Sequence, residues 1–135
     1  MTLFVFLFLN LFKPVLSISF TNIKEAKGSL YVGVYKSEAD FMKEEKACLK
    51  KIIPVTATGN LDLDVSELAP GTYAVSCFHD INGNGKLDTN FLGIPSEPYG
   101  FSNNARPKLR APNWSETKFE VKTGGSRISI RLEKW

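Results

Sequence analysis

The stretch "GTYAVSCFHDINGNGKLD", Gly71 to Asp88, combines the two features that determine the predicted fold of this chain. Its first half alternates, so that Tyr73, Val75 and Cys77 fall on one face of an extended chain. A period of two with apolar and aromatic residues predicts a β-strand. Its second half is rich in Asp, Asn and Gly, which predicts a tight polar turn directly after that strand.

The same alternation occurs elsewhere in the chain. It is present in "ISFTNI" from residue 18, "GSLYVGVY" from residue 28 and "RISIRLE" from residue 127, and shorter runs occur at 49–55, 61–65 and 117–121. About seven short strands between turn signals predict an all-β fold, a single antiparallel β-sandwich over residues 18–135. One short helix is predicted in "SEADFMKEE", where Ser37 and Asp40 have the spacing of a capping box.

Residues 1–17 are predicted to be a signal peptide. The run from Leu3 to Phe12 is almost continuously apolar and too short for a bilayer core of ~30 Å. Small residues follow it, so we expect cleavage after Ser17, export to the periplasm or the extracellular space, and no stable membrane insertion afterwards. No Lys or Arg precedes the apolar run, which departs from a standard export signal. The alternative is a buried first strand of a cytoplasmic domain.

Length, charge and cysteine content narrow the function classes. A chain of 135 residues is long enough for one domain. A net charge of +3 without a basic stripe does not favour nucleic-acid binding. The two cysteines, Cys48 and Cys77, either form one disulfide or remain free thiols, and both alternatives stay open. Neither has a second Cys or a His at zinc-ligand spacing.

The polar turn has the spacing of a calcium loop, D-x-[DN]-x-[DN]-G, with Gly85 at its sixth position. The candidate ligands are four side chains and one backbone carbonyl: Asp80, Asn82, Asn84, Lys86 (carbonyl) and Asp88. Phe91 occupies the position of the usual bidentate carboxylate, so the remaining ligand is expected from Glu97. The expected dissociation constant is ~10⁻⁴ to 10⁻³ M. The alternative is a hairpin turn rich in Asn and Gly that needs no metal.

The segment from Asp80 to Asn113 has no clear periodicity but contains several large apolar residues, so we expect a long ordered loop. Aromatic faces and amide groups in it suggest a site for a saccharide or a peptide. The candidate ligand-binding residues are Tyr99, Phe101, Asn103 and Asn104. The alternative is an Ω-loop whose aromatic side chains cover the open end of the sandwich.

Two motifs, "PGTYAVSCFHDINGNGKLD" and "GIPSEPYGFSNN", carry a resemblance to a known group of proteins. With them, the chain resembles the bacterial "domain of unknown function 2141" family over nearly all of its length after the leader. The resemblance implies a small exported β-sandwich of the transthyretin-like or prealbumin-like kind. It implies no particular activity.

Taken together, these features favour an exported, non-enzymatic binding or structural module whose loop is ordered by calcium. The sequence has no G-x-S-x-G, H-E-x-x-H or phosphate-loop motif, and no catalytic residue is assigned. The alternative is a carbohydrate-active or other hydrolase that uses Glu97, or His79 with Asp80, as its acid or base.

Overall fold

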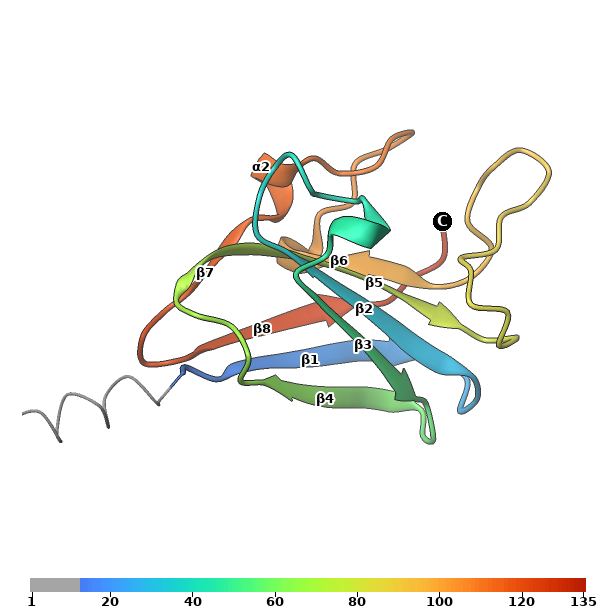
Figure 1. Ribbon diagram of the computed structural model, residues 1–135. Coiled ribbons are helices and arrows are strands. Elements are labelled where there is room, and N and C mark those ends of the chain that lie inside the picture. The colour runs from blue at the N-terminus through green and yellow to red at the C-terminus, as the bar shows by residue number, and fades with distance from the viewer. Residues whose placement is uncertain (1–12) are drawn as a thin grey trace, which may run out of the picture.

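The computed structural model describes residues 13–135, which form two β-sheets packed against each other (Figure 1). The strands are β1 (Leu16–Ile23), β2 (Ser29–Tyr35), β3 (Leu49–Pro54), β4 (Gly59–Val65), β5 (Gly71–Asp80), β6 (Tyr99–Phe101), β7 (Phe119–Val121) and β8 (Ser126–Arg131). The helical elements are η1 (Glu44–Lys46), η2 (Ser102–Asn104) and α2 (Trp114–Thr117). The predicted all-β sandwich is confirmed.

The first sheet has the order β4-β1-β8, and the second has the order β3-β2-β5-β6 with β7 paired to another part of β5. Strands β6 and β7 pair with successive stretches of β5, from Ser76 to Phe78 and from Gly71 to Tyr73. All strand pairs are antiparallel except β1 with β8, which is parallel. The last described strand, β8, therefore lies beside the first, β1, and forms one edge of this sheet.

The core lies between the sheets and is built by the alternation that the sequence shows. Every second residue of each central strand is buried, because successive side chains of a strand point to opposite faces. The inward rows are Leu16, Ile18 and Phe20 in β1, Leu30, Val32 and Val34 in β2, and Tyr73, Val75 and Cys77 in β5. Full burial of one such aliphatic side chain stabilises the fold by about 1.5–3 kcal/mol.

The helix predicted near Ser37 is wrong, and the structure has turns followed by the short η1 there. Ser37 still accepts the Asp40 N–H, but Met42 has φ +66°, a left-handed conformation that ends any right-handed helix. The α-helix lies instead at α2. Asn113 and Glu116 form a complete capping box there, a pair that the sequence reasoning missed.

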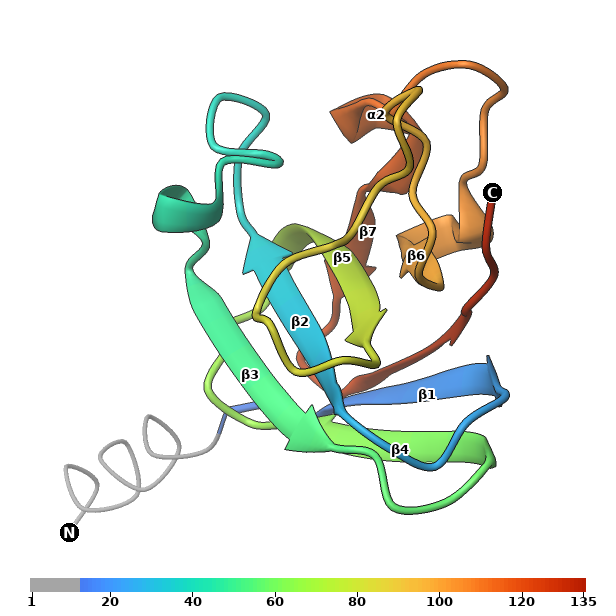
Figure 2. The same cartoon turned by 90° about the vertical axis from the view of Figure 1, so that its right-hand side faces the viewer.

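The long segment after β5 is ordered, as predicted, and it contains strand β6, which was not predicted. Residues 81–98 connect β5 to β6 and cross in front of β2 in the view of Figure 2. Ser102 follows β6 and is fully buried; its hydroxyl accepts the Val75 N–H and donates to the Thr117 carbonyl. These bonds fix the end of β6 to β5 and to α2.

The predicted apolar leader core, Leu3 to Phe12, lies outside the described residues. Strand β1 begins at Leu16, which is fully buried and pairs with Val65 and Ser126. Cleavage after Ser17 would therefore remove the first two residues of β1. Within residues 13–135, no helix has the length and apolar character needed to cross a bilayer.

Replacing Gly100 by Ala is expected to destabilise the fold by about 1–3 kcal/mol, because overpacking strains a close-packed core. A Cβ at this position would lie 2.7 Å from the Arg131 carbonyl oxygen, where β6 approaches β8. The control is Gly124→Ala, where a Cβ meets no atom of residues 13–135 within 4 Å, so a change within about 0.5 kcal/mol is expected. Urea unfolding measures both; equal stability of the two variants would contradict the packing described for β6.

Candidate functional site

Asp80, the last residue of β5, places a buried carboxylate at the start of the polar turn. Its side chain is 1 % exposed. Oδ2 accepts the Gly85 N–H at 2.8 Å and so closes the turn. Oδ1 is buried and has no hydrogen-bond partner among residues 13–135. A buried acceptor without a partner costs free energy, and a charged one costs more.

The other side chains of the predicted calcium loop meet around Asp88. Its two carboxylate oxygens accept hydrogen bonds from the side-chain amides of Asn82 and Asn84, each at 2.6 Å. The amide oxygens in turn accept the N–H groups of Asn84 and Lys86. The hydrogen bond from Asn84 is the largest of the effects that hold the pKa of the Asp88 carboxyl below its usual value. The predicted side chains thus converge on one turn.

Glu97 joins the two ends of this turn from the far side of the loop. Its carboxylate is buried, with Oε2 accepting the Ile81 N–H at 2.7 Å and Oε1 accepting the Asp88 N–H at 3.0 Å. Both oxygens therefore hold backbone groups, a role that was not predicted. Each carboxylate oxygen has a second lone pair, so ligation of a cation is compatible with these bonds.

The turn offers both charged and neutral oxygen atoms to a metal ion. Residues 13–135 contain no group of three His, Cys, Asp or Glu side chains arranged to hold a metal ion. The carboxylates of Asp80, Asp88 and Glu97 therefore do not form such a group, and a cation at this turn would depend on amide and carbonyl oxygens in addition to at most two carboxylates. Calcium accepts this set of neutral and charged oxygen ligands, whereas zinc prefers nitrogen and sulfur.

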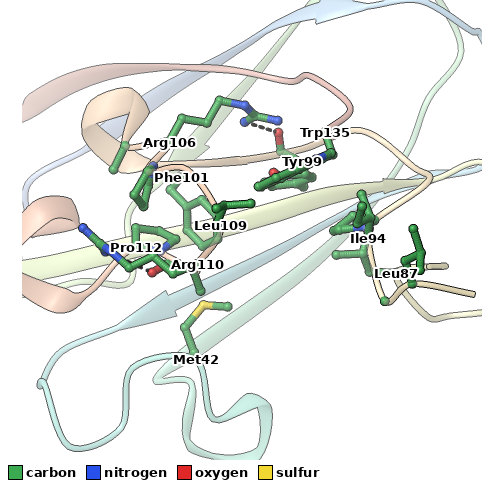
Figure 3. Close-up of a pocket in the computed structure, with 16 residues that line it drawn as sticks. Met42, Leu87, Ile94, Tyr99, Phe101, Arg106, Leu109, Arg110, Pro112 and Trp135 are labelled. Atoms are coloured by element: carbon green, nitrogen blue, oxygen red, sulfur yellow. Dashed lines mark hydrogen bonds between the residues drawn. The ribbon is translucent and has the colours of Figure 1, made fainter. Parts of the chain in front are cut away.

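A pocket of about 530 Å³ lies beside the turn, between residues 87–95, residues 105–112 and strand β6 (Figure 3). Its lining residues are mostly apolar: Met42, Leu87, Leu92, Gly93, Ile94, Pro95, Tyr99, Phe101, Ala105, Arg106, Pro107, Leu109, Arg110, Ala111, Pro112 and Trp135. Tyr99 and Phe101 pack edge to face, and the Arg106 guanidinium lies 4.1 Å above the Tyr99 ring. Both aromatic residues predicted to bind a ligand line this pocket.

The two asparagines predicted to bind the same ligand have structural contacts instead. The Asn103 amide donates to the carbonyls of Glu116 and Lys118, and the Asn104 amide oxygen accepts the Arg131 N–H. Both have positive φ, which Asn tolerates better than most residues. They fix η2 to its neighbours and do not line the pocket.

Of the remaining residues of chemical interest, His79 and Cys77 are buried and Cys48 is exposed. His79 is inaccessible, and its Nε2 lies 2.7 Å from the Lys27 carbonyl oxygen. Cys48 and Cys77 are free thiols. Strand β2 separates β3, which follows Cys48, from β5, which contains Cys77. Two strand spacings, about 9.6 Å, exceed the Cα separation that a disulfide spans. Burial raises the pKa of the Cys77 thiol, so it is unreactive.

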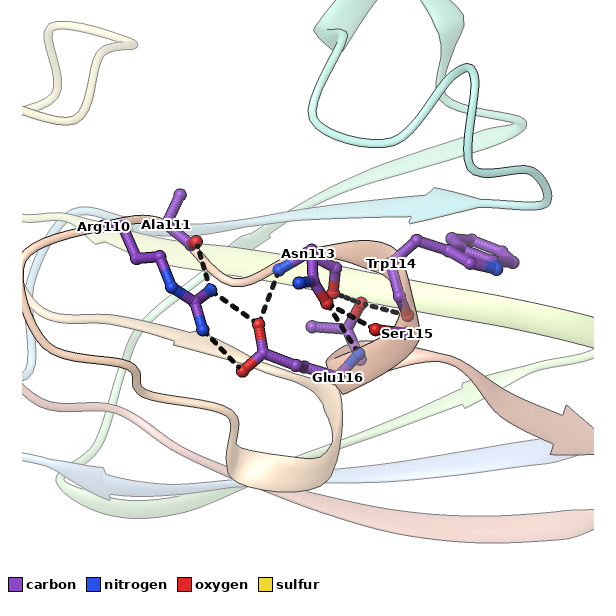
Figure 4. A network of polar contacts seen from close by, with 7 residues as sticks. Arg110, Ala111, Asn113, Trp114, Ser115 and Glu116 are labelled. Carbon is purple, nitrogen blue, oxygen red and sulfur yellow. Dashed lines mark hydrogen bonds and ion pairs between the residues drawn. The ribbon is translucent and has the colours of Figure 1, made fainter.

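One side of the pocket is held by a polar network (Figure 4). Arg110 donates to both carboxylate oxygens of Glu116, at 2.7 and 3.1 Å, and Glu116 Oε1 also accepts the Asn113 N–H. The bonds from Arg110 and Asn113 lower the pKa of Glu116 to about 2. One carboxylate thus caps α2 and fixes the position of a pocket-lining arginine.

Comparison with protein families gives one informative match. A family model described as "Uncharacterized protein conserved in bacteria (DUF2141)" matches residues 18–129. The chain belongs to the DUF2141 family. The resemblance seen in the two motifs is therefore confirmed, and the matched range contains the polar turn and all pocket-lining residues except Trp135. No curated protein and no solved structure matches this DUF2141 protein, so its transthyretin-like assignment stays a prediction.

Replacing Glu116 by Gln is expected to lower stability at neutral pH but not at pH 2. The folded-state pKa of Glu116 is depressed, so its contribution is present above its ordinary pKa of 4.5 and is lost as the pH falls toward about 2. Urea unfolding of both proteins between pH 2 and pH 7 measures the difference. A difference that stays constant with pH would contradict an ionised Glu116 held by Arg110.

Proposed function

We propose that this DUF2141 protein is an exported, non-enzymatic binding module in which calcium orders the loop between β5 and β6. The single observation that supports this most strongly is the buried Asp80 Oδ1, which has no partner among the described residues. A bound cation compensates a buried carboxylate oxygen for which the protein supplies no donor.

The candidate ligand set follows from the contacts of the turn. Asp80 supplies the free oxygen, Asp88 a second carboxylate, and the amides of Asn82 and Asn84 lie against Asp88. The amide nitrogens of Asn82 and Asn84 donate to Asp88 and their oxygens accept backbone N–H groups, so these oxygens would bind a cation through their second lone pairs. Glu97 holds the turn from behind through Ile81 and Asp88. Bound calcium would supply positive charge at this point and no redox chemistry.

The turn is connected to the pocket through the chain and through a hydrogen bond. Leu87 lies in the turn, next to Asp88, and lines the pocket. Ser96 donates its N–H to the Asp88 carbonyl at 2.8 Å, which joins the turn to the stretch 92–95 that also lines the pocket. A cation that fixes Asp88 would therefore also restrain Leu87 and the stretch 92–95 at the pocket.

The buried positions of His79 and Glu97 support a non-enzymatic role. A general acid or base must lie within hydrogen-bond reach of a substrate. Neither residue lines the pocket, and both use their side chains on backbone groups. Export is supported by the apolar run before residue 13, which has the length of a signal-peptide core.

Calcium at 10 mM is expected to stabilise the wild-type protein by roughly 1.4–2.7 kcal/mol if the dissociation constant is ~10⁻⁴ to 10⁻³ M, a rise of roughly 5–10 °C in melting temperature. Asp80→Asn is expected to lose this rise, because the free carboxylate oxygen is removed. In EDTA, its melting temperature should stay within a few degrees of wild type, since Oδ1 has no partner to lose in residues 13–135. Differential scanning calorimetry measures all four conditions.

The matched control is Asp62→Asn on β4, which removes one exposed carboxylate away from the turn and should keep the full calcium response. A wild-type melting temperature that is the same in calcium and in EDTA would overturn the proposal. If Asp80→Asn kept the full calcium-dependent rise in melting temperature, the assignment of the calcium site to Asp80 would be wrong.

A further inference from the structure

Large apolar side chains that are exposed to solvent gather around the pocket. Of the seven such residues in residues 13–135, four line it: Met42, Leu92, Leu109 and Trp135. Leu109 is 89 % exposed. Single exposed apolar residues are ordinary, but a contiguous group of them marks a binding surface.

Two of these residues are also held in an unfavourable backbone conformation. Met42 has φ +66° and Leu109 has φ +63°. The other non-glycine residues with positive φ in residues 13–135 are asparagines, which tolerate it: Asn22, Asn103 and Asn104. A left-handed conformation costs a residue such as Leu about 1–2 kcal/mol. Exposure and backbone strain thus coincide at the two apolar residues of the pocket rim, a combination typical of functional sites.

The charged side chains that line the pocket have one sign. Among the described lining residues, Arg106 and Arg110 are the only ones with charged side chains. Arg106 is fixed by bonds to the carbonyls of Tyr99 and Glu133 and by an ion pair with the Glu133 carboxylate. Arg110 makes three hydrogen bonds, to Ala111 and Glu116, out of the five N–H donors of a guanidinium. Arg110 is half exposed and retains donors for a ligand.

We propose that this pocket binds a small amphipathic anion, a molecule with an apolar body and one acidic group that Arg110 receives. The inference rests on the proposed function only in treating the protein as a binding module. A volume of about 530 Å³ is within the range of small-molecule sites. The apolar body contacts Leu109, Met42 and the Tyr99–Phe101 pair. Binding removes the apolar surface of these side chains and of the ligand from water, which is favourable.

A saccharide fits this pocket less well than an amphipathic anion. Sugar hydroxyls need many hydrogen-bonding side chains, and the lining residues described above include no Asp, Glu, Asn, Gln, Ser, Thr or His. The acidic group of the ligand is favoured because a charge-assisted hydrogen bond to a guanidinium is stronger than a neutral one. The binding energy therefore comes from apolar contact, and the selectivity comes from charge.

The test compares two fluorescent probes that differ by one charged group. 1-Anilinonaphthalene-8-sulfonate carries a sulfonate, and N-phenyl-1-naphthylamine has the same apolar rings without it. Titration of the whole protein in calcium is expected to show sulfonate-probe binding about tenfold tighter than that of the neutral probe, the worth of one hydrogen bond to a charged group. Arg110→Gln should remove this preference, because the sulfonate probe then loses its charge-assisted hydrogen bond.

Two exposed apolar positions provide a matched pair of variants. Leu109→Glu places a negative charge at the pocket and is expected to weaken the sulfonate probe by at least about tenfold. Ile52→Glu makes the same change on β3, at an exposed residue outside this pocket, and should have no effect. Both variants should keep the wild-type melting temperature to within a few degrees, because neither side chain is buried.

The outcomes separate this inference from the proposed calcium role. A calcium-dependent rise in melting temperature without binding of the sulfonate probe overturns the pocket assignment alone. Probe binding that depends on Leu109 and Arg110 without any calcium response supports the pocket and overturns the metal role. Equal affinity for the two probes, or loss of binding in Ile52→Glu but not in Leu109→Glu, also overturns the inference.

Discussion

Two buried carboxylates at the end of β5 are the constraint on which the irregular half of the molecule depends. Asp80 closes the turn through Gly85, and Glu97 holds both ends of the turn through Ile81 and Asp88. Burial of two carboxylates is costly unless each oxygen has a partner, and these bonds supply three of the four. The loop after β5 is therefore held in place by these two carboxylates.

Much of the sandwich could be predicted from the sequence, because strands with one buried face must alternate. The rows that contain Val32, Val75 and Phe20 are buried as this rule requires. The prediction of a helix near Ser37 was wrong because the capping signal is local, and nothing in the sequence indicates the left-handed conformation of Met42 that ends any helix there. Strand β6 was missed because three residues with a central Gly100 carry no periodic signal.

The candidate site was predictable where its residues are close in sequence. The side chains of Asp80 and Asp88 lie in one turn with Gly85, as their spacing indicates, since alternate residues of such a turn share one concave side. The pocket was not predictable, because it joins residues 87–95, residues 105–112, Met42 and the C-terminal Trp135. No local pattern connects these segments, and the exposure of Leu109 is visible only in three dimensions. The aromatic pair of β6 was the one part of the pocket that composition indicated.

The most direct test of the central claim is a crystal structure of the protein grown in calcium, with anomalous diffraction to identify the ion. Our interpretation of the turn predicts a calcium ion 2.3–2.6 Å from Asp80 Oδ1, with Asp88 and at least one of Asn82 and Asn84 also bound to it. A water molecule in that position, with Asp88 still paired to both amides as it is here, would contradict it.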